Sequence, residues 1–279
     1  MHFGSLVAAL GSYLDAQARG GRWLVRMEDL DPPREMPDAA DEILRTLDLF
    51  GLHHDGEIMY QSHRHEAYQA VLDRLIKQGF AYPCACTRRE IREAGTSGGI
   101  YPGTCRNGLP AGREARSMRL RVNAIPIHFS DRLQGPVDEN LHAQVGDFIL
   151  RRADGLYAYQ LAVVVDDAAQ GITDVVRGAD LLDSTCRQIW LQHRLNLPTP
   201  NYLHLPVAVK ADGAKLSKQT FATPLDLKQP TPQLARALRF LGHPVPDTLE
   251  RESPVSFLRW AVSAWNTDLL PRTRTLEAH

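Results

Sequence analysis

Apolar residues in the first 80 positions switch between helical spacing and one short continuous run. Residues 6–19 place apolar side chains on one helical stripe, and the two glycines that follow end this helix. Residues 22–27 predict a buried strand, and helical spacing returns over 37–51 and 62–78. A helix, a strand and two more helices in this order predict an α/β fold with a parallel core.

A similar alternation resumes near residue 148. It predicts strands over 148–150, 173–177 and 202–209 and helices over 159–168 and 181–195. Two final helices are signalled by Thr231-Pro232 and Ser253-Pro254, where a capping residue precedes proline at the first helical position. Residues from 272 onward carry no pattern. We therefore expect a second half of the α/β core, followed by a short helical region.

The segment between these halves differs from them in amino-acid composition. Residues 82–116 are rich in Gly, Pro, Cys and Arg and contain one capping box, from Thr87 to Glu90, and two alternating strands follow over 117–123 and 125–130. We interpret this segment as an inserted subdomain. The expected division is the first half of the core at 1–80, the insertion at 81–146, the second half at 147–205, and a loop with a helical C-terminal region at 206–279.

Composition excludes several protein classes. With 43% hydrophobic and 23% charged residues in 279, the chain is neither disordered nor a coiled coil. No apolar run reaches roughly 18 residues, and the first five residues contain no basic signal segment, so we expect no membrane span and no secretion. Four cysteines are too few for a disulfide framework. We expect a cytoplasmic protein and a monomer.

Charge is unevenly distributed, although the net charge is −1. Residues 22–66 contain eleven Asp or Glu against five Arg, whereas residues 87–121 contain eight Arg against three Glu. The second segment would attract phosphate groups and is a candidate surface for nucleic acid. The alternative interpretation is that both segments are ordinary solvated faces.

Three of the four cysteines lie within 22 positions, at Cys84, Cys86 and Cys105. Three thiolates could hold a tetrahedral zinc ion and leave its fourth position open. Chemistry alone would nominate a histidine or Cys186 as the fourth ligand, and the spacing selects neither. Free structural thiols are the alternative.

Two short segments have the chemistry of phosphate binding. His2, Gly4 and Ser5 lie at the start of the first predicted helix, where backbone N–H groups and the helix dipole favour an anion. Lys215 and Lys218 stand three apart after a predicted turn, in a chain that holds only five lysines. A lysine can follow a phosphate whose charge grows during a reaction.

Charged residues also stand at the ends of two predicted strands. Arg26 and Glu28 end the first strand, and Asp174 and Arg177 belong to a later one. The carboxyl ends of parallel strands are where α/β sheets bind ligands. Such groups could hold an amino group and a carboxylate, or they could form a structural ion pair.

Together these segments resemble the class I aminoacyl-tRNA synthetases of the glutamyl type. His2-Phe3-Gly4-Ser5 is similar to the first signature of that class, HIGH, and Lys215-Leu216-Ser217-Lys218-Gln219 is similar to the second, KMSKS. Residues 25–31, 155–167 and 176–182 also resemble glutamyl-type segments. The resemblance covers most of the chain and implies a Rossmann-type catalytic core.

The resemblance also implies an activity. L-Glutamate would attack the α-phosphate of ATP, with Mg²⁺ on the phosphates, to give glutamyl-adenylate without any need for tRNA. Only about sixty residues follow Gln219, too few for an anticodon-binding domain. This favours paralogues that lack that domain and pass glutamate to the queuosine base at the wobble position of tRNA(Asp).

The resemblance assigns roles to individual residues. Glu28 would hold the α-amino group of glutamate, and Arg177 and Tyr159 would fix the substrate carboxylate. His2, Gly4, Ser5 and Lys218 would bind ATP, and the catalytic groups would be His2, Lys215 and Lys218. The matching paralogues hold a structural zinc ion by three cysteines and a tyrosine, which favours Tyr101 as partner of Cys84, Cys86 and Cys105.

One family feature has no counterpart here. The strand that precedes the HIGH-like signature, with its Arg-Phe-Ala-Pro-Ser type of segment, is expected to be missing, because the chain starts one residue before His2. Two other functions stay open: a catalytic fragment of an ordinary glutamyl-tRNA synthetase, and a non-catalytic, zinc-bearing RNA-binding relative. The short tail argues against the first, and the retained Glu28, Arg177 and Lys218 argue against the second.

Overall fold

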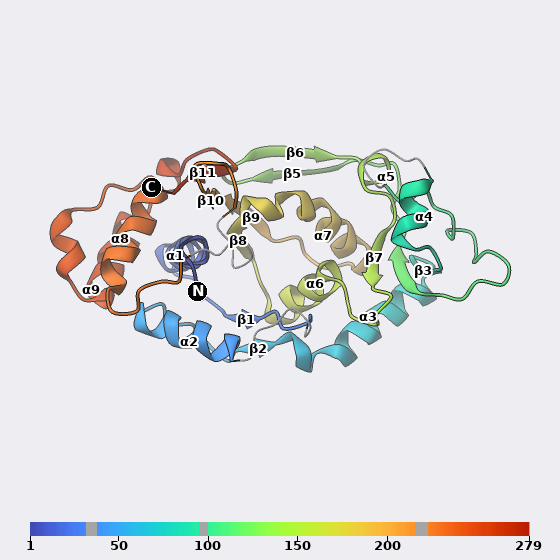
Figure 1. Ribbon diagram of the computed structural model, residues 1–279, viewed down its shortest axis with the longest axis horizontal. Helices are drawn as coiled ribbons and strands as arrows, with labels where there is room; N and C mark the ends of the chain where they lie inside the picture. The colour runs from blue at the N-terminus through green and yellow to red at the C-terminus, as the bar shows by residue number, and fades with distance from the viewer. Residues whose placement is uncertain (32–37, 95–99, 216–222, 279) are drawn as a thin grey trace.

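The computed structural model describes residues 1–31, 38–94, 100–215 and 223–278 (Figure 1). The molecule is elongated, with helices α8 (Pro230–Phe240) and α9 (Pro254–Ala264) at one end. Strand β3 (Ala81–Cys84) and helix α4 (Arg88–Glu93) of the insertion lie at the opposite end. The α/β elements lie between the two ends.

Two pairs of parallel strands form the described part of the α/β core. Strand β1 (Arg26–Met27) pairs with β2 (Met59–Tyr60), and β8 (Asp174–Gly178) pairs with β9 (Asn201–Leu205). Helices α6 (Tyr159–Gln170) and α7 (Leu182–Leu195) pack on each other beside the second pair. The parallel direction of the paired strands agrees with the α/β fold that the alternating helical and strand periodicities predicted.

Helix α1 (Phe3–Ala18) anchors the larger hydrophobic cluster. Its fully buried Leu6, Leu10 and Leu14 stand at the helical spacing seen in the sequence. The helix packs against α8, α9 and β8, so it joins the C-terminal helices to the core. Helices α2 (Ala39–Leu49) and α3 (His65–Lys77) also form where helical spacing predicted them.

The insertion is built from antiparallel strands. Strands β3, β4 (Ser117–Leu120) and β7 (Phe148–Arg151) form one sheet, and β5 (Ile127–Asp131) pairs with β6 (Gly135–Glu139) in a hairpin. Helix α4 has the predicted capping box, and α5 (Leu141–Gln144) follows the hairpin. Strand β7, which we expected within the returning parallel core, pairs with β4 instead, because its alternating burial lets it complete the sheet of the insertion.

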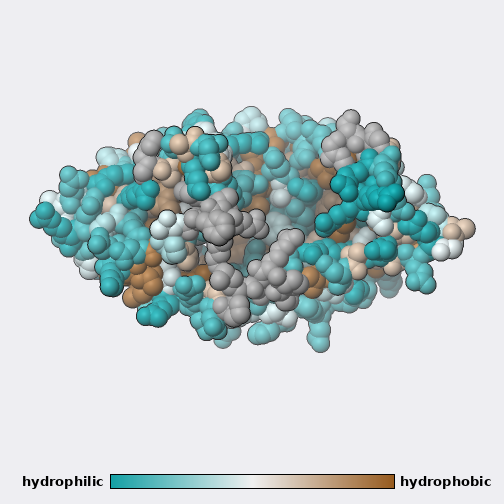
Figure 2. Space-filling model, in the orientation of Figure 1, coloured by the Kyte–Doolittle hydropathy of each residue, from teal (hydrophilic) through white to brown (hydrophobic). Residues whose placement is uncertain are grey.

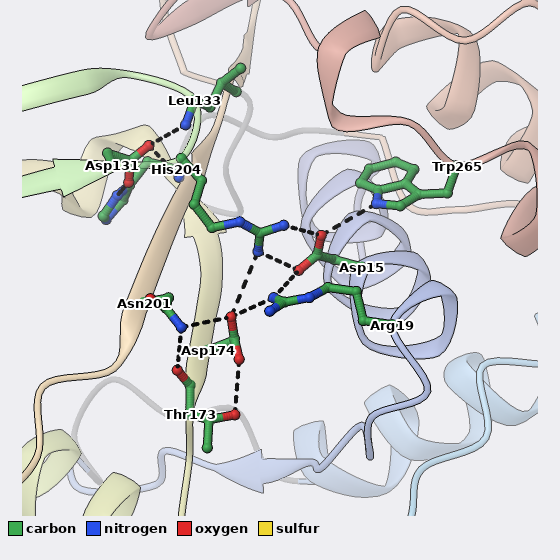
Figure 3. A network of polar contacts seen from close by, with 10 residues as sticks. Asp15, Arg19, Asp131, Leu133, Thr173, Asp174, Asn201, His204 and Trp265 are labelled. Carbon is green, nitrogen blue, oxygen red and sulfur yellow. Dashed lines mark hydrogen bonds and ion pairs between the residues drawn. The ribbon is translucent and has the colours of Figure 1, made fainter.

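An ion-pair network fixes the β5–β6 hairpin onto the core (Figure 3). Arg132, in the hairpin turn, donates to both carboxylate oxygens of Asp15 on α1, at 2.6 and 2.8 Å. Asp174 of β8 accepts from Arg19 at 2.5 Å and lies 3.8 Å from Arg132. The Trp265 indole also donates to Asp15. Two-pronged contacts to a buried carboxylate fix orientation as well as distance.

Four local expectations were wrong. The strand over 202–209 is divided into β9 and β10 (Val207–Val209), because proline at 206 interrupts the ladder. The strand expected over 22–27 contains only two residues, Arg26 and Met27. Thr231 lies inside α8, where its hydroxyl donates to the Glu252 carbonyl instead of capping. The unpatterned tail contains β11 (Thr275–Glu277), which pairs with β10.

Among the described residues, no helix is both long and apolar enough to cross a membrane.

Candidate active site and metal centre

A groove of about 650 Å³ lies between β1 and β8 and separates the two pairs of parallel strands. Residues 22–24 with Arg26 and Glu28 line one side, and residues 174–176 of β8 line the other. The last two turns of α1 and the end of α6 complete the walls. Because carboxyl ends of parallel strands are the usual ligand sites of α/β folds, the polar groups just after β1 and near the end of β8 form the candidate active site, with Glu28 in this lining and Arg177 beyond it.

Arg177, near the end of β8, is the most heavily bonded of these groups. Its side chain is buried and donates to the Tyr159 hydroxyl at 3.2 Å, Thr185 Oγ1 at 2.9 Å and Gln188 Oε1 at 2.8 Å. Its Nε also donates to Nε2 of His204, on β9, at 3.0 Å. The structure therefore brings together Arg177 and Tyr159, the two residues expected to bind a carboxylate.

Glu28 lies at the end of β1 with 42% of its side chain exposed. Arg26 is 3.4 Å from it and forms a closer ion pair, at 2.9 Å, with Asp167 of α6. The groove walls remove water from Glu28 and raise the pKa of its carboxyl, while Arg26 opposes that shift. Arg26 is closer to Asp167 than to Glu28, so the exposed Glu28 carboxylate is the group here that can attract an ammonium group.

The phosphate-binding candidates are only partly described. His2 caps α1: its Nδ1 accepts from the Ser5 amide at 3.3 Å, and its Nε2 lies 3.0 Å from the Ser5 hydroxyl. Gly4 lies in the first turn of the same helix. Lys215 forms an ion pair with Asp180 at 2.5 Å. Lys218 lies outside the described residues.

The predicted metal ligands come together in the insertion. The sulfurs of Cys84, Cys86 and Cys105 all lie within 4.8 Å of one another, and those of Cys86 and Cys105 are 3.6 Å apart. The Tyr101 hydroxyl lies 3.4 Å from the Cys84 sulfur and 3.9 Å from that of Cys86. Ligands on a tetrahedral zinc are roughly 3.8 Å apart for bonds of about 2.3 Å. These four groups therefore fit zinc, and Cys186 is not part of the cluster.

Arg119 completes the surroundings of this cluster. It is buried, its Nε donates to the Cys84 sulfur at 3.2 Å, and its guanidinium lies 3.8 Å from the centre of the Tyr101 ring. Burial opposes ionisation of Cys84, but hydrogen bonds from Tyr101 and Arg119 lower the pKa of its thiol below the ordinary value. A positive group here offsets the charge of thiolates.

The arginine-rich segment divides into exposed and internal residues. Arg88, Arg89 and Arg92 are exposed on α4, where Figure 2 shows a strongly hydrophilic group. In contrast, Arg106 forms an ion pair with Asp147 at 2.7 Å, and Arg119 is buried at the cysteines. Some of these arginines therefore stabilise the inside of the insertion, and the others face solvent.

Sequence reasoning missed two residues beside Arg177. His204 and Asp131 are both buried, and they are 2.6 Å apart. The only available signal was a histidine within an apolar strand, and a satisfied core histidine gives the same pattern. Their connection to Arg177 depends on the pairing of β9 with β8, which joins segments 27 positions apart.

Comparison with known proteins identifies the chain's relatives. A family model described as tRNA synthetases class I (E and Q), catalytic domain, matches residues 1–233. The chain is 59% identical over 277 residues to the glutamyl-Q tRNA(Asp) synthetase of Dechloromonas aromatica, covering 98% of this chain and 92% of that protein. It is 55% identical to the protein of the same name from Ectopseudomonas mendocina, with 99% and 92% covered.

Solved structures show the same fold. The glutamate-tRNA synthetase of Elizabethkingia anophelis superimposes with a TM-score of 0.80 at 22% identity, covering 99% of this chain. A glutamate tRNA ligase of Elizabethkingia meningosepticum gives 0.81 at 22% identity, covering all of this chain. The chain spans 65% and 64% of the length of these two enzymes.

Proposed function

The chain belongs to the class I tRNA synthetases of the E and Q type, and on that premise we propose that it glutamylates queuosine in tRNA(Asp). It first activates L-glutamate with ATP to glutamyl-adenylate, without tRNA, and then transfers glutamate to the modified wobble base. The single observation that supports this most strongly is the hydrogen bond between Arg177 and Tyr159, in a site where Arg177 also interacts electrostatically with Glu28.

In this proposal Arg177 and Tyr159 bind a carboxylate of glutamate. The guanidinium can only donate, and the Tyr159 hydroxyl, which accepts from Arg177, keeps its own proton to donate, so the pair favours an ionised carboxylate over an amide. Glu28 binds the α-amino group, because it is the exposed carboxylate at the neighbouring strand end. The remaining carboxylate of glutamate is then the nucleophile that attacks the α-phosphate of ATP.

The ATP phosphates bind at the start of α1. The backbone N–H group of Gly4 offers a donor, and that of Ser5 donates to His2, which holds the first turn in place. Lys218 stabilises the charge on departing pyrophosphate. Lys215, three residues earlier, is held by its ion pair with Asp180. Mg²⁺ would neutralise phosphate charge in this site.

A structural zinc ion is held by Cys84, Cys86, Cys105 and Tyr101. Their mutual distances match a tetrahedral site, and Arg119 supplies compensating charge. This ion holds the insertion together, so the segment 81–146 presents its exposed arginines, among them Arg88 and Arg92, to the phosphates of an RNA stem-loop.

The core is of Rossmann type, and the groove between β1 and β8 is the place where a further parallel strand would fit. Each of these strands is paired on one side only among the described residues. An extended segment entering the groove would therefore have a partner strand on each side. Adding a segment of the Arg-Phe-Ala-Pro-Ser type before residue 1 should raise both melting temperature and activity. An unchanged melting temperature would contradict this placement.

Glutamate-dependent exchange of pyrophosphate into ATP tests the activation step. We expect exchange with L-glutamate in the absence of tRNA. Lys218→Ala should lower kcat about 100-fold or more with little change in the KM for glutamate, since one transition-state contact is removed. Arg177→Lys should instead raise the KM for glutamate. Exchange that requires tRNA would contradict the proposal.

A further inference from the structure

A buried chain of three polar side chains leads from the inserted hairpin to the proposed glutamate site. Asp131 is the last residue of β5, and its Oδ2 lies 2.6 Å from Nδ1 of His204. Nε2 of the same imidazole accepts a hydrogen bond from Nε of Arg177 at 3.0 Å. Asp131 and His204 are 2% and 0% exposed, so water does not compete for these contacts.

These contacts allow one tautomer of His204. Arginine can only donate, so Nε2 must be the unprotonated acceptor nitrogen. The proton is then on Nδ1, where an ionised Asp131 accepts it. Hydrogen bonds from His204 and from backbone amides hold the pKa of Asp131 below its ordinary value, against the effect of burial.

We infer that Asp131 and His204 are positioning residues: they fix the guanidinium of Arg177 in the orientation that receives the glutamate carboxylate. This inference rests on the proposed function. Nε of Arg177 is occupied by His204 and Nη2 by Thr185 and Gln188, which leaves Nη1, beside Tyr159, to offer an N–H to the substrate. A guanidinium fixed in this way loses less rotational freedom when it binds.

The same carboxylate also builds the turn of the β5–β6 hairpin. Oδ1 of Asp131 accepts from the backbone N–H groups of Leu133 at 3.0 Å and His204 at 3.2 Å (Figure 3), and from that of Gln134 at 2.8 Å. The turn and the imidazole therefore share one anchor. A movement of the hairpin that displaces Asp131 would therefore displace the imidazole of His204 and, with it, the guanidinium of Arg177.

Asp131→Asn separates the positioning role from simple packing. The remaining carbonyl oxygen can still serve the three backbone amides, but the new amide nitrogen faces Nδ1 of His204. The imidazole must then carry its proton on Nε2, where it opposes the donor of Arg177. We expect the KM for glutamate in pyrophosphate exchange to rise roughly 10- to 100-fold, with a smaller change in kcat and in the KM for ATP.

Gln134→Ala is the matched control. Gln134 lies in the same turn and donates to the carbonyls of His204 and Thr273, but it has no contact with Arg177. Its removal loosens the hairpin without changing the tautomer of His204. Its KM for glutamate should stay within about twofold of the unaltered protein. Equal increases in both variants would overturn the inference.

A second pair of variants decides the question if Asp131→Asn fails to fold. The carbonyl oxygen of glutamine reaches the position of Nε2, whereas the shorter asparagine reaches only that of Nδ1. His204→Gln should therefore keep a near-normal KM for glutamate, and His204→Asn should raise it. The same KM for both variants would overturn the inference.

Nuclear magnetic resonance of the full chain supplies a readout independent of activity. The Nε–H signal of Arg177 should be sharp and slow to exchange in the unaltered protein and in Gln134→Ala, and lost in Asp131→Asn. A signal that survives in Asp131→Asn would contradict the inference. If these signals behave as expected but the unaltered protein fails to activate glutamate, the proposed function fails and the contact between His204 and Arg177 stands.

Discussion

Buried charged residues in this protein each contact several partners at once. Asp166 of α6 is fully buried and accepts from Gln61 at 2.9 Å, Arg64 at 3.1 Å and the Tyr68 hydroxyl at 2.6 Å. Arg177 has a comparable set of acceptors. A buried charge is tolerated only when such partners replace its water. At the scale of single residues, the site is therefore held rigidly before any substrate binds.

Replacement of one thiol tests the metal centre. Cys105→Ser should reduce bound zinc from one equivalent per chain to less than half, because one of three thiolates is removed. The insertion should become more sensitive to proteases while the core stays folded. Metal content is measured by elemental analysis after purification without added zinc.

The fourth cysteine provides a matched control for this experiment. Cys186 is buried in α7, outside the cluster, so Cys186→Ser should retain a full equivalent of zinc. Less than a tenth of an equivalent in the unaltered protein would contradict the zinc assignment.

At the scale of elements, the hairpin turn joins α1, β8 and β9 through charged contacts. Asp15→Ala should lower the free energy of unfolding by about 2–4 kcal/mol, because Arg132 loses a buried bidentate partner. Asp183→Ala removes an exposed ion pair with Arg274 and should change it by less than about 0.5 kcal/mol. Denaturant unfolding measures both. Equal effects would show that the Asp15 network does not hold the hairpin.

The segment between α8 and α9 should make stability depend on pH. Burial lowers the pKa of His243 below 6.5, although its hydrogen bonds with Leu241 and Asn266 oppose the shift. The unfolded chain therefore takes up a proton at a higher pH than the folded one, and stability falls as pH drops below about 6.5. Melting temperatures between pH 7.5 and 5.5 should show this decrease.

A substitution attributes that decrease to the buried ring. His243→Gln should reduce the difference in melting temperature between pH 7.5 and 5.5, whereas His142→Gln, at an exposed position, should leave it unchanged. An undiminished difference in His243→Gln would place the titrating group elsewhere.

Apolar periodicity predicted the helices well because it reports which face of a helix is buried. Helices α1, α6 and α7 form within a few residues of the expected ranges. Strand partners were not predictable in the same way. Strand β7 pairs with β4 and β11 pairs with β10, and a strand's own pattern does not encode its neighbour.

The candidate site was predicted where its chemistry is local. The cysteines stand close in sequence, and Arg177 and Tyr159 were paired by resemblance, as the structure has them. Asp131 and His204 were missed because 73 positions separate them. Contacts between distant segments arise from tertiary packing, which spacing along the chain does not reveal.

At the scale of the whole molecule, the groove between the parallel strand pairs and the zinc-type cluster lie in different regions. The carboxyl ends of β1 and β8 carry the proposed activation chemistry, and the insertion carries the exposed arginines of α4 at one end of the molecule. This separation suits a substrate that brings its reacting base to these strand ends while its phosphates contact the insertion. Binding of RNA should then weaken steeply as salt rises.

The most direct test of the proposed function is the identity of the glutamate acceptor. Radiolabelled glutamate and ATP would be offered with tRNA(Asp) from cells that make queuosine and from cells that do not. We predict label only on the modified tRNA(Asp), retained on an anticodon fragment after nuclease digestion. Label on the unmodified tRNA(Asp), or preferentially on tRNA(Glu), would contradict the account and indicate an ordinary glutamyl-tRNA synthetase activity.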